Sequence, residues 1–240
     1  MQWGSHSLKG KVMQGWRSVN VLIVYYSRYG NTAKLAEAVA EGVRLSPQDQ
    51  AWVRRVADLE PDDVIRQDER WWRTREQLRQ HSPLPQPAEL QRADALVLGS
   101  PGYFGNMAAA LKHWLEVEMG GLWRGAAIEE KAAAAFCTTS TVHGGNEITL
   151  STMLTALMHM GFVISPAGYL YPTLRRNEMP YGASSVTGPN ADQPPTEEDL
   201  GAARALGFRV AHVARALLAG RGQEEFRRRY SQWQSGPPRT

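Results

Sequence analysis

A short turn of hydroxyl, amide and glycine residues is the part of the chain best suited to bind a ligand. It follows the apolar run Val21–Val24 and precedes Ala33–Val43, in which apolar residues recur at helical spacing. The N–H groups at a helix start give such a turn a positive partial charge. The turn lacks the Gly-Lys-Ser/Thr ending of a triphosphate loop and the spaced glycines of a dinucleotide fingerprint, so it predicts a site for a terminal phosphate monoester such as that of FMN. Taken alone, it also fits an ordinary strand-to-helix turn. Its residues are Ser27, Arg28, Tyr29, Gly30, Asn31 and Thr32.

Two further loops have a similar composition and follow predicted strands. Ser100–Met107 follows the apolar run Ala95–Gly99, and Thr138–Asn146 follows Lys131–Cys137. The alanines of Lys131–Cys137 favour a helix by propensity, but the segment lies between two predicted helices, so we interpret it as a strand. Parallel strands bring their carboxyl ends to one edge of a sheet, where α/β proteins bind ligands. The three loops together therefore indicate a binding site more strongly than any one of them alone.

Apolar runs and helical segments alternate along the chain, which predicts an α/β fold with a doubly wound parallel sheet. Thr196 and Asp199 form a capping-box pattern that marks the start of the last helix. The polar segment Asp62–Gln80, which contains Trp71 and Trp72, is expected to be an irregular excursion with some helix. The remaining expected elements are the strands Ala51–Leu59 and Phe162–Ile164, the helices Ala108–Val117 and Glu147–Met160, and the loops His81–Pro87, Gly120–Glu130 and Thr187–Pro195.

Length, charge and cysteine content limit the class of protein. We divide the 240 residues into an N-terminal extension (1–18), one α/β domain (19–220) and a basic polar C-terminal tail (221–240). A net charge of +3 with interspersed signs does not favour nucleic acid as a partner, and no apolar run approaches the ~20 residues of a membrane span. The single cysteine, Cys137, cannot form an internal disulfide and fits a reducing compartment such as the cytoplasm. No spacing of histidines or carboxylates indicates a metal.

Four separated motifs, SRYGNT, SPGYFGNM, GGLW and PYGASSVTG, resemble the WrbA family of flavodoxin-like NAD(P)H:quinone oxidoreductases. The resemblance runs from about Val19 to Gly220. It implies a flavodoxin-like, five-stranded parallel sheet in the order 2-1-3-4-5, FMN at the sheet edge, and a homotetramer. It also implies a two-electron reduction of quinones to hydroquinones by NAD(P)H, through a ping-pong hydride-transfer cycle. The natural quinone and the choice between NADH and NADPH stay open.

The resemblance also implies roles for individual residues. His159 would be catalytic and reach the pyrimidine end of the flavin, while Tyr29 and Trp123 would contact the substrate. The family often has arginine where Tyr103 stands, and the loop after the fourth strand is one residue longer here, around Val142 and His143. The residues implied to bind FMN are Ser27, Arg28, Tyr29, Gly30, Asn31, Thr32, Gly102, Tyr103, Phe104, Thr138, Thr139, Ser140, Thr141, Gly144 and His159.

Other functions and roles compete with this interpretation. One alternative is a flavodoxin that carries single electrons to a protein partner, and another is a non-catalytic binding partner of a transcriptional regulator, which only the basic tail supports. Tyr103, Phe104 and Trp123 fit core or interface aromatics equally well by composition. A lone histidine on a helix, such as His159, is more often a packing residue.

Overall fold

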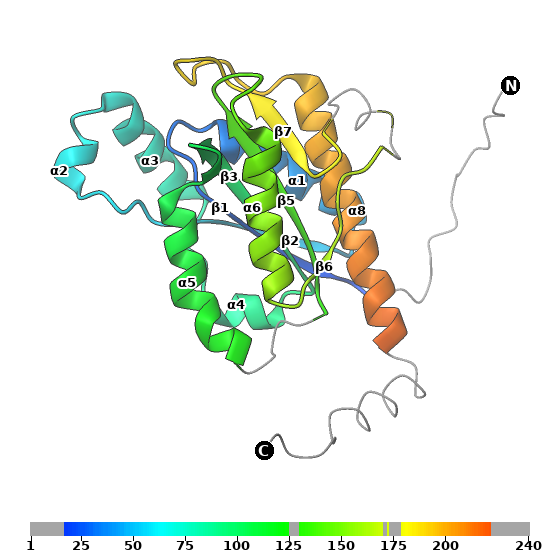
Figure 1. Cartoon of the computed structure of the whole chain (residues 1–240). Helices are drawn as coiled ribbons and strands as arrows, with labels where there is room; N and C mark the ends of the chain where they lie inside the picture. The colour runs from blue at the N-terminus through cyan, green and yellow to red at the C-terminus, as the bar shows by residue number, and fades with distance from the viewer. Residues whose placement is uncertain (1–16, 125–129, 170–171, 173–178, 222–240) are drawn as a thin grey trace, which may run out of the picture.

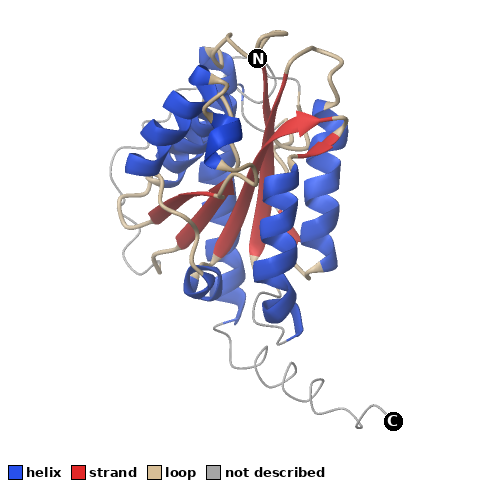
Figure 2. Cartoon of the chain, turned by 90° about the vertical axis from the view of Figure 1, so that its left-hand side faces the viewer, coloured by secondary structure: helices blue, strands red, loops and turns tan. Residues whose placement is uncertain are grey.

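The computed structural model describes residues 17–124, 130–169, 172 and 179–221. A mainly parallel sheet forms the centre and is covered by helices on both faces (Figures 1 and 2). The strands are β1 (Asn20–Tyr25), β2 (Gln50–Arg55), β3 (Ala95–Tyr103), β4 (Asn106–Met107), β5 (Ala132–Thr139), β6 (Val163–Ile164) and β7 (Ala183–Val186). The helices are α1 (Asn31–Val43), α2 (Asp62–Ile65), α3 (Glu69–His81), α4 (Pro87–Arg92), α5 (Ala109–Arg124), α6 (Asn146–His159) and α8 (Glu197–Arg221).

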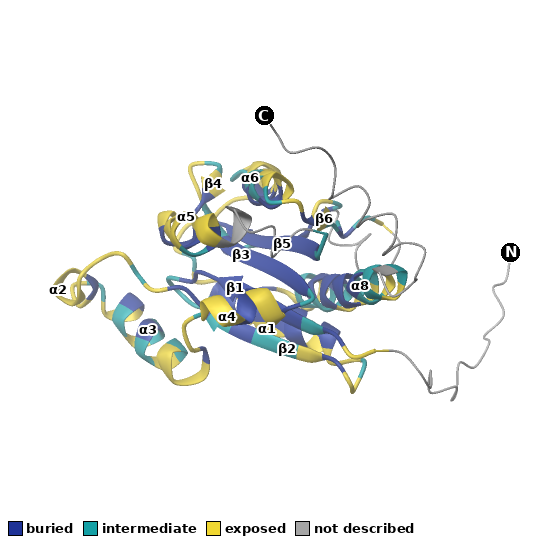
Figure 3. Cartoon of the chain, turned by 90° about the horizontal axis from the view of Figure 1, so that it is seen from below, coloured by how far each residue is buried: buried dark blue, intermediate teal, exposed yellow. Residues whose placement is uncertain are grey.

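Two hydrophobic clusters, one on each face of the sheet, hold the layers together. α1 and α8 contribute to one cluster, whereas α5 and α6 contribute to the other. Figure 3, a view from below, shows the buried sheet between these two layers. The central strands β1, β3 and β5 are buried on both faces over most of their length, because crossover helices cover both sides of a parallel sheet.

The strand order confirms the predicted arrangement of five positions. The order is β2-β1-β3-β5-β6, β7 also pairs with β5, and β4 pairs antiparallel with the end of β3. The fifth position is thus divided, because Ala132–Ala133 of β5 pair with β6 and Phe136–Thr139 pair with β7. The sequence does not predict β7, since Ala-Ser-Ser-Val contains too few apolar residues to signal a strand, although most of it is buried.

Small residues allow the layers to approach closely. β5 is a strand, as predicted, and every one of its residues is buried even though half of them are alanines. A Cβ at Gly99 would lie 2.0 Å from the Phe136 ring, so a glycine there makes room for that ring. A Cβ at Gly42 would lie 1.9 Å from the Arg204 carbonyl oxygen, so α1 and α8 pack at backbone contact. Burial between layers therefore overrides the helix propensity of the alanines.

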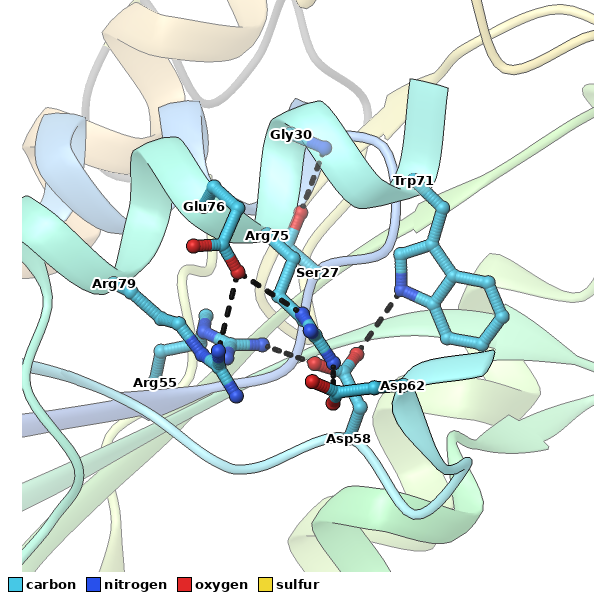
Figure 4. A network of polar contacts seen from close by, with 9 residues as sticks. All are labelled: Ser27, Gly30, Arg55, Asp58, Asp62, Trp71, Arg75, Glu76 and Arg79. Carbon is cyan, nitrogen blue, oxygen red and sulfur yellow. Dashed lines mark hydrogen bonds and ion pairs between the residues drawn. The ribbon is translucent and has the colours of Figure 1, made fainter. Parts of the chain in front are cut away.

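The segment between β2 and β3 is more regular than the irregular excursion that the sequence predicts. It forms α2 and α3, and α3 begins after Asp68, whose carboxylate accepts a hydrogen bond from the Trp71 backbone N–H (3.0 Å). A buried ion pair joins Arg55 to Asp58 (2.9 Å), and the Trp71 indole N–H donates to Asp58 (3.1 Å) (Figure 4). These contacts attach α3 to the chain just after β2, beside the carboxyl edge of the sheet (Figure 1).

Two helix boundaries test the local signals in the sequence. The capping box is confirmed, because the Thr196 backbone N–H donates to Asp199 Oδ2 (3.0 Å) and the Asp199 N–H donates to Thr196 Oγ1 (3.2 Å). The expected end of α5 at Val117 is wrong, since the helix continues to Arg124. Trp123 therefore lies in a helix rather than in a loop, and its side chain lies outside the described part of the structure. The two predicted terminal segments lie almost entirely outside the described residues.

Candidate functional site

The turn between β1 and α1 is shaped by one glycine and one serine hydroxyl. Gly30 has a φ of 92°, which favours glycine, and α1 begins at the next residue. Ser27 Oγ accepts hydrogen bonds from the backbone N–H groups of Gly30 (3.1 Å) and Ala33 (3.4 Å), the first of which is drawn in Figure 4. The Ser27 hydroxyl therefore folds the turn through its oxygen and keeps its own proton to donate.

A cavity of about 450 Å³ lies at the carboxyl edge of the sheet, where the three predicted loops meet. We call it the cofactor cavity. The hydroxyls of Thr32 and Thr138 lie 2.9 Å apart and join the first turn to the loop after β5. The residues that line this cavity are Arg28, Tyr29, Asn31, Thr32, Asp68, Arg70, Pro101, Gly102, Tyr103, Thr138, Thr139, Ser140, Thr187, Pro189, Asn190 and Ala191.

The size and the donors of the cofactor cavity fit FMN. Its volume is within the range of roughly 300–1,000 Å³ that small-molecule sites occupy. The start of α1 lies at the cavity, and the first turn of this helix has no acidic residue and no side-chain cap. Of the described lining residues, Asp68 alone carries a carboxylate. The hydroxyls and helix N–H groups can therefore hold a phosphate. The Tyr103 side chain, which lines the cavity, can pack against a flat ring.

Most residues that the resemblance places around FMN are gathered at this edge. Ser27 and Gly30 shape the turn, while Phe104, Thr141 and Gly144 belong to the same loops but do not line the cavity. Phe104 is fully exposed and has a φ of 54°, at the turn between β3 and β4. The predicted residues that line the cavity are Arg28, Tyr29, Asn31, Thr32, Gly102, Tyr103, Thr138, Thr139 and Ser140.

One wall of the cavity comes from segments that the sequence analysis did not assign to the site. Arg70 of α3 donates hydrogen bonds to the backbone carbonyls of Asn190 (2.7 Å) and Ala191. The side-chain amide of Asn31 also donates to the Ala191 carbonyl (2.8 Å). These contacts join α1, α3 and the loop after β7 around the cavity. No signal in the sequence places this loop at the site, because it follows β7, a strand that the sequence does not predict.

A tyrosine and an aspartate join the phosphate turn to α3. The Tyr29 hydroxyl donates to Asp68 Oδ2 (2.7 Å). Burial raises the pKa of Asp68, but hydrogen bonds from Tyr29 and from the Trp71 backbone, together with the charge of Arg28, outweigh burial and hold this pKa below its ordinary value. Burial and the bond to Asp68 raise the pKa of Tyr29. At neutral pH, Asp68 is therefore the charged acceptor and Tyr29 the protonated donor.

The structure does not bring His159 or Trp123 to the cofactor cavity of its own chain. α6 begins at the loop after β5 and runs back to the other edge of the sheet, where His159 is its last residue and is exposed. Fourteen helical residues span about 20 Å, so His159 lies that far from the start of α6. Trp123 lies near the same edge, at the end of α5. His143, in the loop after β5, is the histidine at the carboxyl edge, and it is exposed outside the cavity lining.

The described residues offer neither a metal site nor a membrane span. No group of three or more histidine, cysteine or carboxylate side chains within them is placed to hold a metal ion. None of the helices in this part of the chain has the length and apolar character needed to cross a bilayer.

Comparison with known proteins gives one consistent picture. Residues 19–172 match the family described as NADPH-dependent FMN reductase. A protein of Geobacter sulfurreducens named NAD(P)H dehydrogenase (quinone) is 40% identical over 205 residues, which cover 83% of this chain and 99% of the relative. A Gluconacetobacter diazotrophicus protein of the same name is 38% identical over 204 residues, 83% of this chain and 98% of the relative. The WrbA-like flavodoxin of Agrobacterium tumefaciens has the same fold, with a TM-score of 0.56 and 23% identity over 82% of this chain and 98% of that one.

Proposed function

The chain belongs to the NADPH-dependent FMN reductase family, and from this premise we propose that it is an FMN-dependent NAD(P)H:quinone oxidoreductase. The observation that carries the proposal is the cofactor cavity, which combines a phosphate cradle with an aromatic wall at one sheet edge. The two relatives described above are named for this activity. NAD(P)H and a quinone are thus the proposed substrates. We also propose a cytoplasmic location, because the one cysteine, Cys137, is free and buried, which fits a reducing compartment.

The residues of the phosphate turn would hold the cofactor by its terminal phosphate. The start of α1 supplies backbone N–H groups, and the hydroxyls of Ser27, Thr32 and Thr138 supply further donors. Gly102 and Tyr103 would lie along the flat ring, with Thr139 and Ser140 at its polar edge. When bound, FMN supplies the redox chemistry, which is the transfer of two electrons from NAD(P)H to the quinone.

The protein itself needs no nucleophile for this reaction. Its side chains orient the two substrates and exclude water from the reacting face. Donor and acceptor are both flat and would use the same open side of the cavity in turn, which leads to a ping-pong order. Tyr29 stays protonated because its hydroxyl donates its one proton to Asp68, so it would contact the substrate as a neutral phenol and not as a base.

The positions of His159 and Trp123 lead us to a shared site. Both lie at the sheet edge opposite the cofactor cavity of their own chain. A role for His159 at the flavin, as the resemblance implies, therefore requires the cavity of another copy. We propose a homotetramer in which the α5 and α6 ends of one subunit complete the cavity of a neighbour. The fully exposed Phe104, beside the cavity, is a ring that a neighbouring subunit could cover in such an assembly.

A spectrum and a rate test the function together. Purified protein should show the visible absorbance of FMN, lose it on addition of NADPH under nitrogen, and recover it on addition of menadione. Steady NAD(P)H consumption with menadione distinguishes the enzyme from an electron carrier and from a binding module. A protein that binds no FMN after reconstitution, or that holds FMN but oxidises neither NADH nor NADPH, would contradict the proposal.

A further inference from the structure

Arg28 lies on a fixed aromatic surface beside the cofactor cavity. Its guanidinium carbon is 3.7 Å from the centre of the Trp71 ring and 5.5 Å from that of the Tyr29 ring. The side chain therefore leaves the phosphate turn and stacks over α3. Trp71 is itself held, because it is buried and its indole N–H donates to Asp58. The network in Figure 4 thus fixes the ring that positions the guanidinium of Arg28.

Arg28 forms no direct ion pair in the described part of the chain, although its charge acts on the nearby carboxylate of Asp68. The buried arginines Arg55 and Arg75 do form ion pairs, with Asp58 (2.9 Å) and Asp62 (2.9 Å). Arg28 forms no ion pair with a described carboxylate, and its Nε is buried without a hydrogen-bond partner. A buried donor without a partner costs free energy. The fold therefore holds a positive charge at this point, and an anionic ligand could supply the hydrogen-bonding partner that it lacks.

Arg28 also lies at the junction of two cavities. A second cavity, of about 550 Å³, adjoins the cofactor cavity, and Arg28 and Tyr103 line both of them. The second cavity is mostly apolar, with Lys112 as a further cation and Glu60 as its one described carboxylate. A ligand that lies on the cofactor and extends into the second cavity must pass the guanidinium of Arg28.

We propose that Arg28 binds a phosphate of the nicotinamide dinucleotide at this junction, and that the second cavity receives the rest of that substrate. The inference rests on the proposed function. The cofactor phosphate already has the start of α1 and the hydroxyls of Thr32 and Thr138, whereas Arg28 turns away from them onto Trp71. A guanidinium binds phosphate and carboxylate oxygens through two parallel hydrogen bonds, and the dinucleotide offers phosphates. Quinones such as menadione carry no phosphate, so Arg28 would distinguish the electron donor from the acceptor.

Two phosphates of the donor share this chemistry, and truncated ligands separate them. ADP-ribose carries the diphosphate that NADH and NADPH have in common, and 2′-phospho-ADP-ribose adds the phosphate that only NADPH has. Calorimetry on FMN-loaded protein would measure both dissociation constants for the native chain, Arg28→Met and Arg28→Lys. Arg73→Met is the control, because Arg73 is an exposed arginine of α3, the helix over which Arg28 stacks, and it pairs with Glu69.

We expect Arg28→Met to weaken binding of at least one ligand by roughly ten- to a hundredfold, as for a hydrogen-bonded charge. Equal weakening of both ligands assigns Arg28 to the diphosphate, and weakening of 2′-phospho-ADP-ribose alone assigns it to the 2′-phosphate. Arg28→Lys should retain part of the affinity, and Arg73→Met should match the native protein. The KM for menadione should stay unchanged in all variants. In the native protein, binding should also weaken at high salt, a test that needs no variant.

Two results would overturn the inference. One is unchanged affinity for both ligands in Arg28→Met, and the other is a tenfold loss of FMN affinity with native dinucleotide binding, which would assign Arg28 to the cofactor. Failure of the proposed function looks different, because the native protein would then bind no FMN or consume no NAD(P)H with menadione. A native enzyme that is active while its Arg28→Met variant binds both ligands normally would contradict this inference alone.

Discussion

The two edges of the sheet carry different parts of the proposed site. At the carboxyl edge, loops from three crossovers converge within one chain on a cavity with phosphate-binding character. At the opposite edge, α5 and α6 end with Trp123 and His159, far from that cavity. The first edge is organised by hydrogen bonds such as that between Thr32 and Thr138. The second presents an exposed histidine to whatever lies outside the subunit.

The difference shows which residues of a site one chain can bring together and which would have to come from a second copy. In a parallel sheet, each helix returns from the carboxyl edge to the amino edge, so a residue at the helix end cannot meet the loop at its start. A resemblance in sequence gives a residue's role without saying which copy of the chain supplies it. The position of His159 turns a predicted contact into a prediction about the oligomer.

The largest expected effect is at the carboxyl edge. Replacing Ser27 and Thr32 together by alanine removes hydroxyls that hold the turn together and that, by our proposal, donate to the phosphate. Hydrogen bonds to a charged group are worth about 1.5–3 kcal/mol each, so FMN affinity should fall by roughly a hundred- to ten-thousandfold. Calorimetry with FMN measures this directly. The matched control removes two exposed polar groups of α6, with Ser151→Ala and Thr155→Ala, and should bind FMN normally. Unchanged affinity in the double variant of the turn would show that this loop does not hold the phosphate.

The next effect concerns the opposite edge. His159→Ala should keep FMN bound but lower kcat by roughly ten- to a hundredfold, which is the worth of one hydrogen bond to a charged group. The exposed His113 of α5 supplies the control variant, His113→Ala, which should leave kcat unchanged. Native kinetics in His159→Ala would make His159 a surface or packing residue.

Mixing two defective subunits tests whether the site is shared. One subunit carries Ser27→Ala with Thr32→Ala and has a complete amino edge, and the other carries His159→Ala and has a complete cofactor cavity. Co-expressed subunits should be more active than either homo-oligomer, because the histidine of one would reach the flavin of the other. Light scattering should give a tetramer at micromolar concentration. A monomer with FMN bound, or a mixture no more active than its parts, argues for a site within one chain.

Initial-rate kinetics of the native protein test whether one cavity serves both substrates. If the open side of a single cavity serves both substrates, initial rates at several fixed menadione concentrations should give parallel double-reciprocal lines against NADPH. High menadione should inhibit competitively with NADPH. Intersecting lines would instead place the quinone at a site of its own, for which the second cavity beyond Tyr103 offers room.

Much of the fold followed from local patterns, and the misses have physical causes. Continuous apolar runs marked β1 and β3, and the capping box marked α8. The segment containing α2 and α3 is so polar that its hydrophobic pattern is weak, and its stability comes from the contact of Trp71 with Asp58, which links residues thirteen positions apart. Sequence periodicity does not register such contacts.

The candidate site divides in the same way. Loops that follow predicted strands could be assigned to one edge, because topology alone places them there. These loops supply the following residues of the cavity lining: Arg28, Tyr29, Asn31, Thr32, Pro101, Gly102, Tyr103, Thr138, Thr139 and Ser140. The Arg70 contacts to the Asn190 and Ala191 carbonyls were beyond reach, since they depend on how α3 lies against a loop 120 residues away. The end of α6 was predicted to within one residue, yet only the structure shows at which edge of the sheet it lies.

The smallest expected effect is at the contact that joins the phosphate turn to α3. Asp68 accepts bonds from the Tyr29 hydroxyl and the Trp71 N–H, and it caps α3. Asp68→Ala removes the cap and should cost about 0.5–2 kcal/mol of unfolding free energy. Asp68→Asn keeps a capping oxygen and loses only the charge, which is favourable at a helix start, so its cost at neutral pH should be smaller.

The pH dependence of Asp68→Asn identifies the charge as the cause. Hydrogen bonds lower the folded-state pKa of Asp68 against the opposing effect of burial, so the native protein binds this proton less readily than the unfolded chain. The stability from the charge is therefore fully present above the unfolded-state pKa of about 3.9 and is lost as the pH falls through the lower folded-state value. Urea unfolding of the native protein and of Asp68→Asn should differ near neutral pH, and the difference should shrink steadily below about pH 4. A difference that stays constant across this range would mean that the amide is tolerated poorly for its shape, and that the charge of Asp68 does not stabilise the attachment of α3 to the carboxyl edge.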